Sequence, residues 1–155
     1  MEYIYATGGR EKYFKAENVG DCVTRAITLA TGKDYLEVYK ALKELAKKEN
    51  TKKHSKSSVR DGVYKETWKR YLELIGWEKV STIKKGDPRR MHLTDDECPK
   101  DPVCIIQLSK HLVCLKNGVI YDTYNCSEKH FYDREGNLCV NNQRLIYSYY
   151  VPKLV

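Results

Sequence analysis

The sequence lacks any long apolar run, and this excludes two kinds of segment. No stretch approaches the about 18 apolar residues that a membrane-spanning helix needs, and no apolar run of signal-peptide length stands near Met1. We therefore expect a cytoplasmic protein that makes no contact with a membrane.

Cysteine pairs of the CxxC type are also missing. Because disulfides are rare in reducing compartments, free thiols are favoured over a disulfide framework. The spacing of the cysteines does not match a zinc ribbon or a zinc finger, so neither a metal nor another cofactor is predicted. The six cysteines are Cys22, Cys98, Cys104, Cys114, Cys126 and Cys139.

Phenylalanine is scarce, with two residues against 13 tyrosines, which indicates half-buried aromatic surfaces. The 155 residues are 41% apolar and 32% charged, as expected for a globular chain rather than a disordered one. No internal repeat and no second domain can be recognised, so residues 1–155 are predicted to form one domain. The net charge of +7 favours an acidic partner, although a charge of this size also serves solubility.

Three helices are predicted in the first half of the chain. Apolar residues recur at helical spacing over residues 21–31, and Gly32 ends this first helix. The second helix begins at Asp34, an N-cap residue for which Glu37 completes a capping box. The third helix is predicted roughly over residues 62–75, with Gly76 as its stop signal.

A basic, polar stretch, "KKENTKKHSKSS", follows the second helix. One interpretation of the region Lys43–Lys56 is a mobile surface loop, in which His54 is solvated rather than catalytic. The other is a contact with an acidic protein or a nucleic acid. Since no aromatic residues are interleaved with the lysines, nucleic acid is the less favoured partner.

In the second half of the chain the apolar residues no longer recur at helical spacing. Short runs rich in β-branched and aromatic residues indicate strands: "WEKVSTI", "PVCIIQLS", "HLVCLK", "VIYDTY" and "RLIYSYYV". Helices come first and strands later, so the predicted class is α+β, with N-terminal helices packed on a C-terminal antiparallel sheet.

The stretch "NVGDCVTRAITLATG" places Cys22 where a loop turns into the first helix. A helix N-terminus offers free N–H donors and a partial positive charge, and both favour the thiolate. A buried structural thiol has no need of this position. Arg25, three residues later, is predicted to anchor the helix to a carboxylate or to backbone carbonyls.

The stretch "HLVCLKNGVIYDTYN" contains Asn117–Gly118, the strongest short-range signal for a two-residue hairpin turn. Such a turn fixes the register and places His111 opposite Tyr124. Strand alternation then makes Asp122 the diagonal neighbour of His111 on one face, within reach of a hydrogen bond. A carboxylate there would hold the imidazole tautomer and turn its other nitrogen outward.

Together these residues are the parts of a thiol nucleophile, its base and an orienting acid: Cys22, His111 and Asp122. Each part alone is a weak signal, because such residues are more often structural. The predicted register supports their combination. Asn125 is a reserve candidate for the third member, although its strand parity is opposite to that of His111.

A cysteine on a helix, followed by a histidine on a strand and an Asp or Asn on the next strand, resembles the papain-like cysteine peptidase superfamily. "GDCVTRAI" also resembles the Cys box of OTU-type deubiquitinases, although the acidic residue that opens that box is replaced in the region of Val19. "GDCVTRAITLATGKDYLEVYKAL", "YLELIGWEKV", "MHLTDDECP" and "SKHLVCLKNGVIYDTYN" resemble an uncharacterised family of small bacterial and phage proteins. This last resemblance extends from Tyr3 to Tyr150.

The papain-like resemblance implies that Cys22, His111 and Asp122 take the roles of nucleophile, base and orienting acid. It also implies a side-chain amide before the cysteine that shares the oxyanion with a backbone N–H, and Asn18 is the only amide just upstream. Its spacing is shorter than that of the papain glutamine. Asp21 is expected to cap the helix, since a carboxylate aimed at an oxyanion would oppose it.

The resemblance implies a cysteine hydrolase that acts on peptide or isopeptide bonds of a protein or peptide substrate. Acyl transfer to an amine would use the same parts. Peptidoglycan hydrolysis is less favoured, because "DCVTR" lacks the Ser-Gly pair of NlpC-like enzymes. The alternative is a papain-like scaffold that works as a non-catalytic binding or inhibitory protein of phage origin, with the basic region and the tyrosine-rich C-terminus as its surfaces.

Overall fold

The computed structural model describes residues 1–15, 20–52, 54–82 and 91–154. Its helices stand in the first half of the chain and most of its strands in the second, so the predicted α+β class is confirmed. The helices are α1 (Cys22–Thr31), α2 (Tyr35–Ala46) and α3 (Lys65–Leu74), with a short 3-10 helix at Arg10–Lys12. The strands are β1 (Tyr3–Tyr5), β2 (Trp77–Ser81), β3 (Val103–Leu108), β4 (His111–Lys116), β5 (Val119–Asp122), β6 (Lys129–Tyr132), β7 (Leu138–Asn141) and β8 (Ser148–Pro152).

Six of the strands form one sheet in the order β1-β5-β4-β3-β8-β2. The expectation of a purely antiparallel, C-terminal sheet is wrong in one respect. Strand β1, from the start of the chain, pairs in parallel with β5, and this makes the sheet mixed. A three-residue strand with exposed side chains carries too little periodicity for its partner to be predicted.

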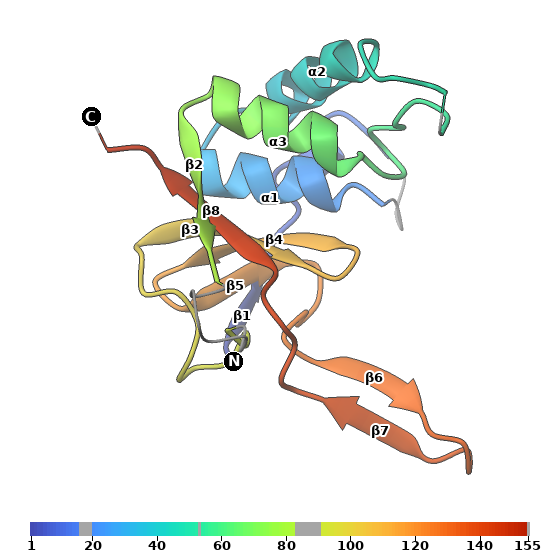
Figure 1. The fold of residues 1–155 in the computed structure, drawn as a ribbon, viewed down its shortest axis with the longest axis vertical. Helices are drawn as coiled ribbons and strands as arrows, with labels where there is room; N and C mark the ends of the chain where they lie inside the picture. The colour runs from blue at the N-terminus through green and yellow to red at the C-terminus, as the bar shows by residue number, and fades with distance from the viewer. Residues whose placement is uncertain (16–19, 53, 83–90, 155) are drawn as a thin grey trace.

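The helices cover one face of the sheet (Figure 1). Buried side chains from α1, α2 and α3 pack there against residues of β3, β4 and β8. A second apolar cluster fills the opposite face, where residues 91–98 and 144–147 lie over β3, β4 and β5 without forming a helix. Both faces of β3 and β4 are therefore buried, which explains their nearly continuous apolar runs.

One helix start and one helix cap differ from the predictions. The third helix begins at Lys65 rather than near Gly62, because Ser58 and Gly62 close a tight turn through two backbone hydrogen bonds of 2.7 and 3.1 Å. The second helix does begin after Asp34, but the Asp34 side chain makes no capping bond. Its carboxylate accepts a 2.5 Å hydrogen bond from the Tyr13 hydroxyl instead.

The basic region Lys43–Lys56 is not one continuous loop. Its first residues, up to Ala46, belong to α2, and residue 53 lies outside the described residues. His54 stacks on Tyr64, with ring centroids 3.7 Å apart, and its Nε2 lies 3.0 Å from a Glu66 carboxylate oxygen. In the described part of the chain no helix is long and apolar enough to cross a membrane.

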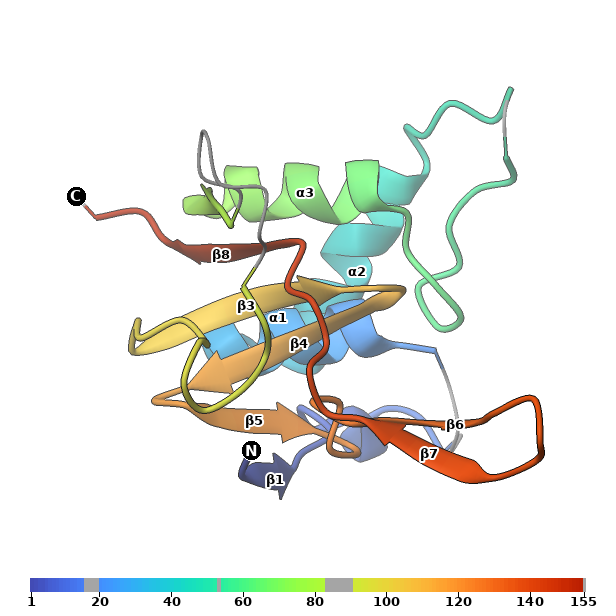
Figure 2. The ribbon, with the colours of Figure 1, turned by 60° about the horizontal axis from the view of Figure 1, so that its bottom comes forward.

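A two-stranded hairpin, β6–β7, stands apart from the main sheet (Figure 2). It was not predicted, because its residues are exposed on both faces and therefore show no clear alternation of apolar and polar side chains. It follows β5 and the segment of Asn125 directly, so it projects from the neighbourhood of the predicted site.

Candidate active site

The site forms where the first residue of α1 meets one end of the sheet. Cys22 is that first helical residue, because Asp21 has non-helical backbone angles and Arg25 N–H bonds to the Asp21 carbonyl. His111 begins β4 and Asp122 ends β5. In an antiparallel pair the start of one strand adjoins the end of the other, so both side chains lie at the same end of the sheet.

The β4–β5 hairpin has the predicted register. Leu115 pairs with Ile120 and Lys116 with Val119, and the turn residues Asn117 and Gly118 have φ values of 49° and 78°, as a type I′ turn requires. This register brings His111 and Asp122, diagonal neighbours at the other end of the hairpin, into contact.

The His111 ring contacts the Asp122 carboxylate directly. Nε2 of His111 lies 2.6 Å from Oδ2 of Asp122, and both side chains are largely buried. The Tyr124 ring also lies beside the imidazole, with centroids 5.4 Å apart. The carboxylate thus fixes the orientation of the ring.

The Cys22 thiol lies close enough to the His111 ring and to the backbone of Leu112 for both to affect its pKa. Burial raises the pKa of the thiol, but the interaction with His111 and the charges of His111 and Arg25 outweigh this and lower the pKa of Cys22 overall. Burial conversely lowers the pKa of His111, and the bond to Asp122 and the interactions with the neighbouring thiols raise it to about 12. Both shifts favour a thiolate–imidazolium pair.

The second oxygen of Asp122 binds the first helix. Oδ1 accepts a hydrogen bond of 3.1 Å from Nη2 of Arg25 and one of 2.7 Å from the backbone N–H of Thr123. Burial raises the pKa of Asp122, but the bond to His111 and the charge of Arg25 lower it overall, so the carboxylate stays ionised. Arg25 thus has the anchoring role that its position predicted.

Asp21 does not cap α1 as predicted. Its side chain makes no capping hydrogen bond. The carboxylate is 1% exposed and accepts bonds from Arg25, from Nη1 of Arg10 at 3.0 Å and from the Tyr35 hydroxyl at 2.6 Å. Burial and the bond to Asp21 raise the pKa of Tyr35. Two arginines and two aspartates therefore form a buried, charge-balanced group under the helix.

Asn125, the reserve third member, forms its side-chain hydrogen bonds with residues other than His111. Its amide nitrogen donates to the Met1 carbonyl at 3.2 Å, and its oxygen accepts from the Ser127 hydroxyl at 2.6 Å. Asn18, the predicted oxyanion residue, lies outside the described residues.

Cys126 is a member of the site that sequence reasoning missed. It is fully buried, its sulfur lies within 4.8 Å of a His111 ring nitrogen, and burial raises the pKa of its thiol. It follows Asp122 by four residues beyond the end of β5, where strand periodicity no longer places a side chain. No sequence signal marks it.

Donor atoms of His111, Asp122 and Cys126 lie within 4.8 Å of one another, and within the described residues this is the only group of three that could surround a metal ion. Two of these donors already share the bond between His111 and Asp122. The Arg25 guanidinium beside Asp122 adds a positive charge, which opposes a cation. The arrangement suits proton transfer better than metal binding.

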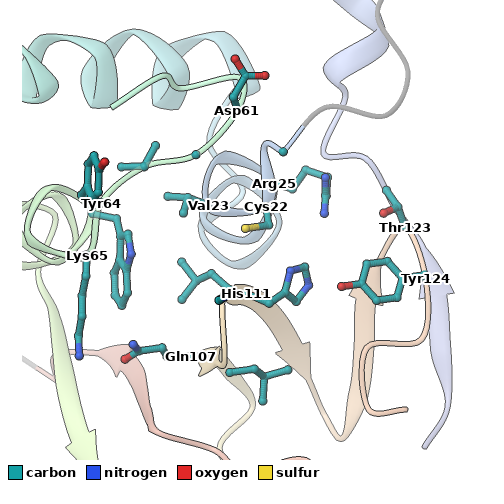
Figure 3. Close-up of a pocket in the computed structure, with 17 residues that line it drawn as sticks. Cys22, Val23, Arg25, Asp61, Tyr64, Lys65, Gln107, His111, Thr123 and Tyr124 are labelled. Carbon is teal, nitrogen blue, oxygen red and sulfur yellow. The ribbon is translucent and has the colours of Figure 1, made fainter. Parts of the chain in front are cut away.

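A cavity of about 640 Å³ opens beside Cys22 and His111 (Figure 3). One wall comes from the start of α1, another from residues 61–65 and α3, and a third from the ends of β3 and β4. Gly20 stands at the junction of two walls, since a Cβ built on it would lie 2.5 Å from the Asp61 carbonyl oxygen. Cys22 and His111 are thus open to a ligand.

Comparisons with known proteins add no relative: no family model, no curated protein and no solved structure matches the chain.

Proposed function

We propose that the protein is a papain-like cysteine hydrolase that cleaves peptide or isopeptide bonds. The observation that carries this proposal is the chain of contacts from the Cys22 thiol through the His111 ring to the Asp122 carboxylate, open to a cavity. The same order of nucleophile, base and orienting acid defines thiol-dependent acyl transfer in general.

The reaction begins with attack of the Cys22 sulfur on the substrate carbonyl. Since the thiolate is favoured before the substrate binds, the imidazolium of His111 already holds the proton that the leaving amine needs. The carbon–nitrogen bond then breaks, His111 protonates the amine, and an acyl thioester remains on Cys22. Water, deprotonated by the neutral imidazole, releases the acid and restores the thiol pair.

The negative oxygen of the tetrahedral intermediate needs donors. The first turn of α1 supplies backbone N–H groups, and the Asp21 side chain does not cap them. The Asp21 carboxylate is paired with Arg10 and Arg25 instead, and this keeps the negative charge of Asp21 away from the oxyanion. We assign the Cys22 N–H to the oxyanion, and Asn18 stays a predicted second donor.

A peptide library that includes ε-acylated lysines tests the proposal without a known substrate. Wild type should generate new peptide termini or free lysine amines that mass spectrometry detects, and Cys22→Ala should generate none. Asp122→Asn should slow the reaction, whereas Asn125→Ala, changed at a residue of the same segment, should leave it near the wild-type rate. Digests of wild type and Cys22→Ala that do not differ would contradict the proposal.

A further inference from the structure

The cavity beside Cys22 extends as far as α3, since Lys65 and Trp68 also line it. Figure 3 shows Lys65 and Tyr64 on one side of Cys22 and Tyr124 and Thr123 on the other. His111, which would protonate the leaving amine, lies between Cys22 and Tyr124 in this view. The part of a substrate that stays attached to sulfur therefore runs toward Lys65.

This side of the cavity has a rigid apolar wall. Trp68 is 5% exposed, and its ring meets Tyr150 edge-on with centroids 5.4 Å apart. Leu112 and Val23 line the cavity from the sheet and from α1, and both are buried. These walls accept the methylene groups of a side chain.

The rim of the cavity carries positive charge. Lys65 and Lys110 line the cavity, and neither forms an ion pair with a carboxylate of the described residues. Figure 3 shows the Lys65 side chain extending toward the Gln107 amide.

The other charges of the cavity do not cancel the lysines. Arg25 is paired with two buried aspartates. Asp61 accepts a 3.0 Å hydrogen bond from the Ser58 hydroxyl and lies at the far end of the view from the Lys65 ammonium. The side of the cavity that carries Lys65 thus combines an apolar wall with an ammonium group that pairs with no carboxylate of the described residues.

We infer that this part of the cavity binds an acidic side chain, best a glutamate, on the acyl side of the bond that Cys22 attacks. The methylenes of the glutamate pack on Trp68 and Leu112, and its carboxylate faces Lys65, with Lys110 as a second cation. This substrate preference rests on the proposed function, because it takes Cys22 as the attacking atom.

The test uses tetrapeptidyl acyloxymethyl ketones in matched pairs that carry glutamate or glutamine at one position and alanine elsewhere. The second-order rate of Cys22 labelling is followed by intact mass. At one position the glutamate probe should label about fivefold faster than the glutamine probe, as expected for a partly exposed charge pair. Lys65→Glu should abolish or reverse this preference.

Lys40→Glu is the matched control, since it makes the same change of charge at an exposed helical residue, on α2, that does not line the cavity. It should keep the preference. Raising the salt concentration should weaken the preference in wild type. Circular dichroism checks that each variant is folded.

Equal rates for glutamate and glutamine at every position, or a preference that survives both Lys65→Glu and Lys110→Glu, would overturn the inference. If Cys22-dependent cleavage of the peptide library still occurs in that case, the proposed function stands and only the acidic preference fails. If no Cys22-dependent cleavage or probe labelling occurs, both fail.

Discussion

Nη2 of Arg25 lies 3.1 Å from Oδ1 of Asp122, although the two residues are 97 positions apart in the chain. Arg25 shares a helix with Cys22, and Asp122 holds the His111 ring. This one ion pair therefore links the helix of Cys22 to the carboxylate that orients the His111 ring.

Replacing Arg25 by methionine should destabilise the protein by about 3–5 kcal/mol, because Asp21 and Asp122 would lose the cation between them while staying buried. Chemical denaturation measures the change in the free energy of unfolding. Lys47→Met removes an exposed ion pair with Glu44 and should change little. An Arg25→Met protein as stable as wild type would show that the buried group does not depend on this guanidinium.

Two tyrosine hydroxyls that bind aspartates offer a second comparison. Tyr35→Phe removes the buried bond to Asp21 and should cost about 1.5–3 kcal/mol, the range for a hydrogen bond to a charged group. Tyr13→Phe removes an exposed bond to Asp34 and should cost far less. Melting temperatures measure both, and equal losses would contradict the burial argument.

A substitution at Gly118 in the β4–β5 turn should lower the stability of the protein through backbone strain alone. A Cβ at Gly118 would meet no atom within 4 Å, but residue 118 has a φ of 78°, which strains the backbone of any residue with a side chain. Gly118→Ala should therefore cost about 1–2 kcal/mol. Gly62→Ala, which also adds its methyl group to open space but at a residue without positive φ, is the control. The prediction fails if the two variants lose the same stability.

The raised pKa of His111 predicts how stability depends on pH. A group whose pKa is higher in the folded protein stabilises it fully below the unfolded value, about 6.5, and this contribution falls as the pH rises toward the folded value of about 12. In a Cys22→Ala background, where no thiol titrates beside the ring, the stability lost on His111→Gln should therefore shrink from pH 6 to pH 9. Thermal denaturation at the two pH values measures it, and a difference that grows would contradict the assigned direction.

Much of the site could be predicted because local signals fix it. Asn117–Gly118 sets the hairpin register, and that register alone brings His111 and Asp122 together. Gly20 and Asp21 ahead of the apolar stripe place Cys22 at the first turn of α1.

The remaining features depend on contacts between distant segments, which no period in the sequence reports. The Asp21 side chain was expected to cap the helix, but Arg10, Arg25 and Tyr35 converge on it from three segments. Strand β1 joins the sheet beside β5 for a similar reason, since its register depends on tertiary pairing. Cys126 reaches His111 only because the chain after β5 folds back.

The pH dependence of Cys22 alkylation tests the central claim, the thiolate–imidazolium pair, most directly. Iodoacetamide labelling of Cys22 is followed by peptide mass mapping between pH 4 and pH 10, with partly exposed Cys139 as an internal reference. Wild type should label with an inflection below the ordinary thiol value, and His111→Ala should move that inflection upward, because the imidazolium then no longer offsets the effect of burial. Profiles of wild type and His111→Ala that coincide would contradict the pairing of Cys22 with His111.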